Sequence, residues 1–163
     1  MMKQITHLAG ISLLLAVTVL ALPWQKSDFS GTWVLDKDKS FSNGAGFDQT
    51  MTITHKNDAF KIEAKQKTAR GEQAITEEFT LDGKVTEYNP PQPPNARGKR
   101  TAAWLPNGRA ILVNDEVTAD GKVIRQVSRK MTLSADGKTL TVDLFIDDSR
   151  GSFESKRIYN RAG

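Results

Sequence analysis

Cysteine is absent from the 163 residues of the chain, and histidine occurs only at His7 and His55. Without cysteine the chain cannot form a disulfide scaffold, a thiolate zinc site or an iron–sulfur cluster, and it has no cysteine nucleophile. Two histidines also argue against a metal site built from several imidazoles. We therefore expect neither a metal nor a cofactor.

An excess of charge of one sign is also lacking. The formal net charge is +4, from 23 basic and 19 acidic residues, and no block of five or more Lys or Arg occurs. Nucleic-acid-binding domains usually concentrate positive charge in such blocks or patches, so we do not expect a nucleic-acid partner. The apolar content of 38% and the chain length are typical of one globular domain.

The only long apolar run is Leu8–Leu22, near the N-terminus. As a helix it would span about 22 Å, which is short against the ~30 Å hydrocarbon core of a membrane. The run predicts a signal peptide over residues 1–21, with the small residues Val19 and Ala21 before the cleavage point. A flexible segment, 22–27, would follow. An uncleaved signal anchor is the alternative.

Export without cysteine favours a bacterial protein, because small secreted eukaryotic domains usually carry disulfides. We therefore expect a periplasmic or secreted protein. No stable membrane span should remain after cleavage, and we expect a monomer.

Beyond residue 24 the sequence shows no helical pattern, and apolar and polar residues alternate with period two. Asn-Asp, Asn-Gly and Asp-Gly pairs separate these runs, and such pairs supply the positive φ angles of tight hairpin turns. About ten strands are predicted, at 31–36, 49–56, 59–66, 73–81, 84–88, 99–105, 109–117, 122–133, 138–147 and 152–161.

The short links between these strands favour an up-and-down antiparallel meander. A flat sheet of this size would expose two long edges and one apolar face, and no helix is available to cover that face. We therefore expect an all-β fold, a single antiparallel up-and-down β-barrel over residues 28–163, in which a small ligand would fit. A filled sandwich without a cavity is the alternative.

Two segments interrupt the alternation. Residues 37–48 are polar with two glycines and are expected to form a loop across one barrel mouth. Residues 88–98 contain four of the six prolines and are expected to run as an extended surface loop, because proline cannot donate to a sheet.

The two ends of the barrel segment carry a resemblance. The first strand opens with Phe29-Ser30-Gly31-Thr32-Trp33, and the last strand contains Arg157-Ile158-Tyr159. These motifs resemble the calycin superfamily of lipocalins and fatty-acid-binding proteins. The opening looks most like that of uncharacterised exported bacterial lipocalin-like domains. The resemblance implies that Trp33 plugs the closed end, with a basic residue of the last strand, Arg161 or Arg157, over its ring.

The resemblance extends over the architecture of residues 28–161 but matches in sequence only at the ends. Residues 37–48 are too few for the helix-turn-helix lid of fatty-acid-binding proteins, and those proteins lack a signal peptide. The disulfide and the C-terminal helix of many lipocalins are also missing.

The fatty-acid-binding branch implies that Arg157 and Tyr159 form a carboxylate clamp, because a guanidinium and a phenol offer a fork of donors. Arg125 and Arg129 share one face of strand 122–133 with Val123, Val127, Met131 and Leu133. We expect a non-catalytic barrel that binds a small hydrophobic or amphipathic anion, such as a fatty acid, with its headgroup at these residues. Tail contacts are expected at Met51, Phe60, Ile75, Phe79 and Leu144.

The arginines also have structural explanations. Glu77 lies on an apolar face and would satisfy an interior arginine, or a bulge would turn Arg125 and Arg129 to solvent. The barrel would then be filled, and the loops would serve a protein-interaction or inhibitor function. An enzyme would need a convergent polar cluster inside the barrel, and we predict no catalytic residues. His55 ends a strand beside a turn and is expected to be exposed.

Overall fold

Ten β-strands make up the regular structure of the computed structural model, which describes residues 26–42, 48–68, 71–106 and 108–163. Within these ranges there is no helix that is long and apolar enough to cross a membrane. The predicted signal peptide, 1–21, lies outside the described residues. The strands are β1 (Gly31–Ser42), β2 (Asp48–Lys56), β3 (Ala59–Thr68), β4 (Gly71–Thr80), β5 (Thr86–Tyr88), β6 (Arg97–Trp104), β7 (Ala110–Ala119), β8 (Lys122–Leu133), β9 (Thr139–Asp148) and β10 (Gly151–Arg161).

The strands form one antiparallel sheet in the order β4-β3-β2-β1-β10-β9-β8-β7-β6-β5. The first and last strands are neighbours, with Trp33 opposite Arg161 and Leu35 opposite Tyr159. Tight turns at Asn57 and at Asp120, whose φ angles are positive, connect consecutive strands. The predicted all-β, up-and-down architecture is confirmed.

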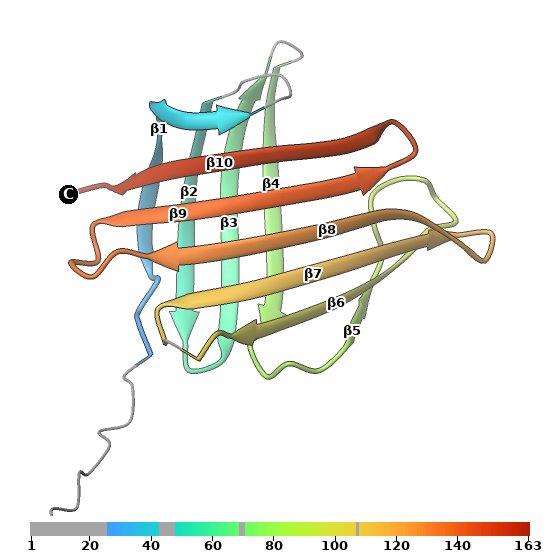
Figure 1. The fold of residues 1–163 in the computed structure, drawn as a ribbon, viewed down its shortest axis with the longest axis horizontal. Coiled ribbons are helices and arrows are strands. Elements are labelled where there is room, and N and C mark those ends of the chain that lie inside the picture. Colours follow the sequence, from blue (N-terminus) through green and yellow to red (C-terminus); the bar gives the residue numbers. More distant parts are fainter. Residues whose placement is uncertain (1–25, 43–47, 69–70, 107) are drawn as a thin grey trace, which may run out of the picture.

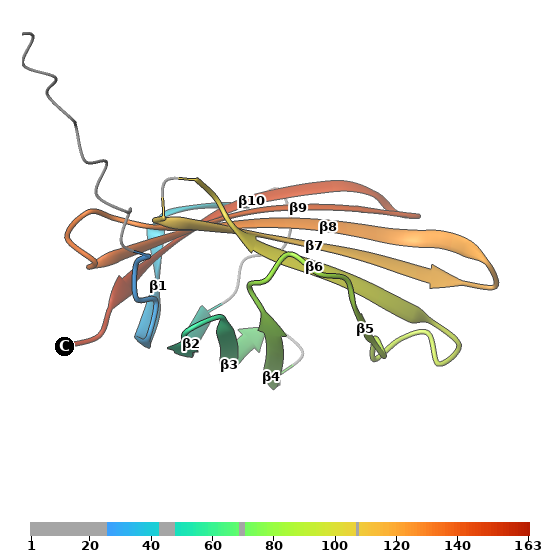
Figure 2. The same cartoon turned by 90° about the horizontal axis from the view of Figure 1, so that it is seen from below.

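The sheet curls into two layers whose strands run across one another. Figure 1 shows β2, β3 and β4 running behind β6 to β10, and Figure 2 shows the two layers from below. The two ends of the sheet, β4 and β5, define a seam in the barrel. At one end of the seam, the chain that follows β4 bonds to β6: the Gly83 amide donates to the Ala102 carbonyl over 2.9 Å. The barrel is therefore nearly closed.

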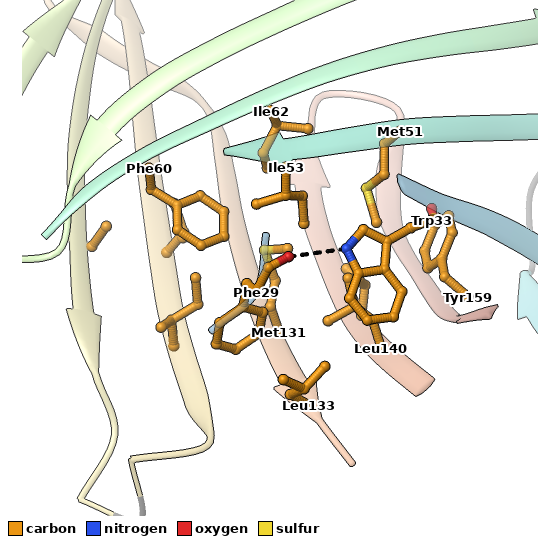
Figure 3. Close-up of a cluster of buried hydrophobic side chains, with 14 of the residues drawn as sticks. Phe29, Trp33, Met51, Ile53, Phe60, Ile62, Met131, Leu133, Leu140 and Tyr159 are labelled. Carbon is orange, nitrogen blue, oxygen red and sulfur yellow. Dashed lines mark hydrogen bonds between the residues drawn. The ribbon is translucent and has the colours of Figure 1, made fainter. Parts of the chain in front are cut away.

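One end of the barrel is packed solid with aromatic and aliphatic side chains (Figure 3). Trp33 and Phe29 are fully buried, and the Trp33 indole donates to the Phe29 carbonyl over 3.0 Å. Phe60, Met131 and Leu140 from three other strands complete this layer. Burying each side chain of this size stabilises the fold by about 2–3 kcal/mol. We call this the closed end.

The predicted loop 37–48 is wrong in its first half, because β1 continues through Ser42. The register shifts between Asp36 and Phe41, and the chain then pairs with β10 again. Ser40 holds this irregularity: its hydroxyl donates to the Asp36 carbonyl and accepts from the Ile158 amide. Polar residues are tolerated here because this part of β1 is mostly exposed. Residues 43–47 lie outside the described residues.

His55 is not exposed, contrary to expectation: only 8% of its side chain is accessible. Its ring lies 5.4 Å from that of Phe60 and 5.5 Å from that of Trp104. The strand alternation places His55 on the inner face with Ile53, and the Asn57 carbonyl satisfies its Nε2 over 2.8 Å. The end of a strand is therefore an insufficient reason to predict exposure.

A bulge also alters the predicted face of β8. The register shifts between Val117 and Thr118 of β7, so Val117 lies opposite Arg125 but Thr118 lies opposite Val123. As a result Val123 is 52% exposed and does not share the inner face with Met131. The proline-rich residues lie between β5 and β6, but they do not run extended: the Ala96 amide donates to the Pro93 carbonyl over 2.9 Å and forms a turn.

Candidate functional site

Burial of the inward-facing side chains decreases along β8 and β9 toward one end of the barrel. On β9, Leu140 and Val142 are buried, whereas Leu144 and Ile146 of the same face are half-buried. On β10, Tyr159 and Ser155 are buried, whereas Arg157 and Phe153 of the same face are half-buried. The interior is thus filled at the closed end and accessible at the other, which we call the open end.

Between the two ends lies a group of five charged side chains, which we call the interior charge cluster. Its members are Glu77 of β4, Arg100 of β6, Asp115 of β7, Arg129 of β8 and Arg157 of β10. The first four form a continuous set of ion pairs and hydrogen bonds.

Glu77 is at the centre of these ion pairs. Its two carboxylate oxygens accept from Arg129 Nη1 and Nη2 over 3.1 and 2.6 Å. Arg100 Nη1 lies 3.1 Å from Glu77 Oε2. Arg100 also donates from Nε and Nη2 to the Asp115 carboxylate, over 2.5 and 2.9 Å. Both carboxylates therefore hold guanidinium groups in paired, directional contacts.

The ion pairs determine the protonation state of this cluster. Burial alone would raise the pKa of Glu77, but the charges and hydrogen bonds of Arg129 and Arg100 outweigh it and hold that pKa below its ordinary value. Burial opposes the charge of Arg100, yet the Asp115 carboxylate raises the pKa of this guanidinium. Glu77 and Arg100 are consequently ionised at neutral pH.

Arg157 and Tyr159 lie together on the inner face of β10. Burial lowers the pKa of Arg157; the Tyr159 phenol opposes this shift, and the positive charge of Arg129 adds to it. Burial likewise raises the pKa of Tyr159, whose hydroxyl donates to the Gln49 side-chain oxygen. Arg157 therefore lies near Arg129 and beside the Tyr159 phenol within the interior charge cluster.

Two buried polar atoms flank the cluster. Arg129 and Ser155 lie opposite Leu144 from its two sides, so they are two strands apart on the same inner face. Arg129 Nε and Ser155 Oγ are buried and have no hydrogen-bond partner within the described part of the chain. Leaving such an atom unsatisfied costs about 1–3 kcal/mol, so a polar group placed between them would be stabilised.

The structure brings three of the predicted headgroup residues together, namely Arg157, Tyr159 and Arg129. It places Arg125 apart from them, at the rim of the open end, where 44% of its side chain is exposed and its Nε lies 3.7 Å from Asp148. The alternative partner proposed for an interior arginine, Glu77, is the one that Arg129 contacts.

The remaining predicted site residues lie nearer the closed end. Phe79 is buried, stacks on Phe60 at 5.2 Å and has the Arg100 guanidinium 5.2 Å above its ring. Phe79 therefore forms a floor beneath the charges. The guanidinium of Arg161 lies 4.3 Å from the ring centre of Trp33.

Sequence reasoning missed Arg100, Asp115 and Gln49. A signal for the first two was present, because Arg100 is in phase with buried Ala102, and Asp115 is in phase with buried Val113. A charged residue on the apolar face of a strand predicts an interior ion pair. Gln49 begins a predicted strand and carries no comparable signal.

The described residues contain no group of three or more His, Asp or Glu side chains placed to hold a metal ion. What the site offers is a set of guanidinium, phenol and hydroxyl donors above an apolar floor.

No protein-family model matches the chain, and no curated protein matches it. Solved structures do. Zebrafish ileal bile acid-binding protein complexed with cholic acid is 14% identical, with a TM-score of 0.52, over 83% of this chain and 100% of that chain. Secretory abundant heat soluble protein 4 from Ramazzottius varieornatus is 9% identical, with a TM-score of 0.54, over 86% and 99% of the two chains. The chain therefore has a calycin-like fold, of the kind seen in fatty-acid-binding proteins.

Proposed function

We propose that this chain is an exported, non-catalytic β-barrel that binds a small hydrophobic or amphipathic anion, such as a fatty acid, inside the barrel. The observation that carries the proposal is the group of polar donors on the inner face, where Arg157 and Tyr159 lie near Arg129. Arg129 Nε and Ser155 Oγ are buried there without a hydrogen-bond partner in the described residues, and a carboxylate is an acceptor that matches such donors.

The tail of such a ligand would lie among the half-buried apolar side chains of the open half. Leu144, Ile146, Phe153 and Val127 face inward there and remain in part accessible. Phe79 belongs to the packed layer beneath them and would contact the ligand from below. An apolar lining with few oriented polar groups is typical of small-molecule sites.

Fold similarity is consistent with this proposal. The zebrafish structure holds cholic acid, which is an amphiphile with one carboxylate. The Phe-Ser-Gly-Thr-Trp opening resembles that of exported lipocalin-like domains, and the apolar N-terminus supports export to the periplasm or the medium.

Binding is tested on delipidated protein by titration with oleate and with its uncharged methyl ester. Arg157→Met should weaken oleate binding by about tenfold or more, because it removes a charge-assisted hydrogen bond, and should leave methyl oleate unchanged. Arg97→Met removes the same charge from an exposed position at the start of β6 and should change neither affinity. Absence of oleate binding above a micromolar background, or an unchanged affinity in Arg157→Met, would contradict the proposal.

Export is tested separately. Mass spectrometry of protein from the periplasmic fraction of an expressing bacterium should give a chain that begins at Leu22. A full-length chain retained in the membrane fraction would favour the uncleaved anchor.

A further inference from the structure

Three glutamines lie side by side on the inner face of the barrel, one on each of β2, β3 and β4. Gln66 pairs with Gln49 on one side and with Gln73 on the other, so the three side chains form a single cross-strand row. Neighbouring side chains in such a row have their Cβ atoms about 5 Å apart. We call these three residues the glutamine row.

The glutamine row lies at the open end of the barrel. On β3, Ala64 is buried, whereas Gln66 of the same face is half-buried. On β4, Phe79 is buried, Ile75 is half-buried and Gln73 is exposed. Burial of the inner face therefore decreases along both strands toward the row, as it does along β9.

Apolar side chains lie next to the row on the side of the closed end. Met51, Ala64 and Ile75 form the adjacent cross-strand row of the inner face. Gln49 also accepts a hydrogen bond from the Tyr159 phenol, which belongs to the proposed headgroup site. A ligand tail that crosses these apolar side chains toward the open end would bring its far end to the glutamine row.

The distance from the headgroup site to the row defines the length of such a tail. Gln73 lies four positions before Glu77 on β4, and Glu77 contacts Arg129 of the headgroup site. Four residues of a strand span about 13 Å. An extended carboxylate of twelve carbon atoms spans about 14 Å, at ~1.25 Å per bond. The far end of a twelve-carbon tail would therefore lie level with the row.

We propose that the glutamine row selects ligands that carry a second, uncharged polar group at the far end of the tail. The inference rests on the proposed function and adds a ligand class to it. The class is hydroxy acids with a chain of about twelve carbon atoms and a hydroxyl at or near the end of the chain.

The chemistry of the side chains supports this choice of ligand. A primary amide donates and accepts hydrogen bonds, so it can satisfy both functions of a hydroxyl, whereas Lys only donates and an ionised Glu only accepts. The residues that alternate with the row on the outer face, Lys65, Lys67 and Glu72, are charged. Charged side chains at this end of the strands therefore face the solvent, and the uncharged amides face the interior.

The test compares dodecanoate with 12-hydroxydodecanoate, titrated into delipidated protein below their self-association limit. The two ligands share the carboxylate and the chain length, so the ratio of their affinities reports the hydroxyl. In an apolar pocket the added hydroxyl would weaken binding about tenfold or more, because it would be buried without a partner. The wild-type protein should instead bind 12-hydroxydodecanoate at least as tightly as dodecanoate.

A double variant removes the amides. Gln66→Met combined with Gln73→Met keeps side chains of similar length without hydrogen-bonding groups, and should shift the ratio about tenfold toward dodecanoate. Gln126→Met makes the same chemical change at an exposed position of β8, on the outer face, and should leave the ratio unchanged.

The outcomes separate the two proposals. If neither ligand binds, the proposed function fails and the role of the glutamine row fails with it. If dodecanoate binds but the wild-type protein binds 12-hydroxydodecanoate more weakly, or if the double variant keeps the wild-type ratio, the glutamine row is not selective and the proposed function stands. The wild-type comparison gives a result even if the double variant does not fold.

Discussion

Arg161 connects three parts of the closed end through one side chain. Its guanidinium covers the Trp33 ring, its Nε donates to the Gly137 carbonyl over 2.8 Å, and Nη1 donates to the Ser30 carbonyl. Planar stacking and in-plane donation occur together only in a guanidinium. The residue therefore ties the last strand to the first strand and to the β8–β9 turn.

Arg161→Lys should lower the free energy of unfolding by about 1–3 kcal/mol, because an ammonium cannot stack and donate in this geometry. Urea denaturation followed by tryptophan fluorescence measures the change. Arg97→Lys, at an exposed position of β6, serves as the matched control and should be neutral. Equal stability of the two variants would show that the stacked guanidinium does not contribute to closure.

Glu77 should make stability dependent on pH in the acid range. Because its folded-state pKa is lowered, its contribution is fully present above the unfolded pKa of about 4.3 and is lost as the pH falls toward the folded value. Glu77→Gln should therefore be less stable at pH 7 but lose less stability between pH 5 and pH 3. Urea denaturation at several pH values, with Glu78→Gln as control, tests this; parallel profiles for wild type and Glu77→Gln would contradict it.

Single-residue alternation placed Arg157 and Tyr159 on one face of β10 and predicted the inward direction of Arg129, whereas the clamp role of Arg157 and Tyr159 was implied by the family resemblance alone. It did not determine which acid each guanidinium would meet. Arg129 meets Glu77 across the barrel, while Arg125 meets Asp148 on the neighbouring strand. Such choices depend on how the sheet curls, and no local pattern contains that information.

At the scale of elements, β5 is only three residues long, and it packs against Gly98 of β6. Tyr88 of β5 lies opposite Gly98, and its ring covers the position that a Cβ of residue 98 would occupy. The same ring lies 4.9 Å from the Arg100 guanidinium. A strand glycine thus lets an aromatic ring from the edge strand cover the backbone.

Gly98→Ala should displace the Tyr88 ring and destabilise the protein by about 1–3 kcal/mol, as overpacking does. Tyr88→Ala in the same chain removes the overlap, so the double variant should lose less than the sum of the two single losses. Thermal or urea denaturation of the four proteins provides the cycle. Additive losses would mean that the ring and the glycine do not interact.

Strand boundaries were harder to predict than strands. All ten strands were predicted, but β1 extends six residues beyond its predicted end at residue 36. Its polar end pairs through the irregularity at Ser40, and alternation at an exposed strand end has no apolar side to reveal it. The β7–β8 bulge was equally invisible in the sequence.

At the scale of the whole molecule, the seam between β4 and β5 is expected to be the least stable part of the barrel. Each of these strands has a ladder on one side only. Side chains join β4 to the opposite layer instead, through Glu77 with Arg100 and Arg129. The seam should therefore open more readily than any fully paired part of the sheet.

Hydrogen exchange should show this difference. Amides of β4 should exchange faster than those of β9, which is paired on both sides, and Glu77→Gln should accelerate β4 further while leaving β9 unchanged. Mass spectrometry of peptides from residues 71–80 and 139–148 measures both rates. Equal protection of the β4 and β9 amides from exchange would show that the seam opens no more readily than the fully paired strands.

The neighbouring positions of β1 and β10 have a consequence for the order of assembly. Asp36 and Asn160 are 124 positions apart in the chain, yet their side chains are hydrogen-bonded at 3.1 Å. Every other strand pairing is a hairpin that forms locally, whereas this one must wait until the last strand has been synthesised. The hairpins of β1–β4 and of β5–β10 can thus form early as two separate meanders. These meanders can pair into one sheet only after the final residues have been synthesised.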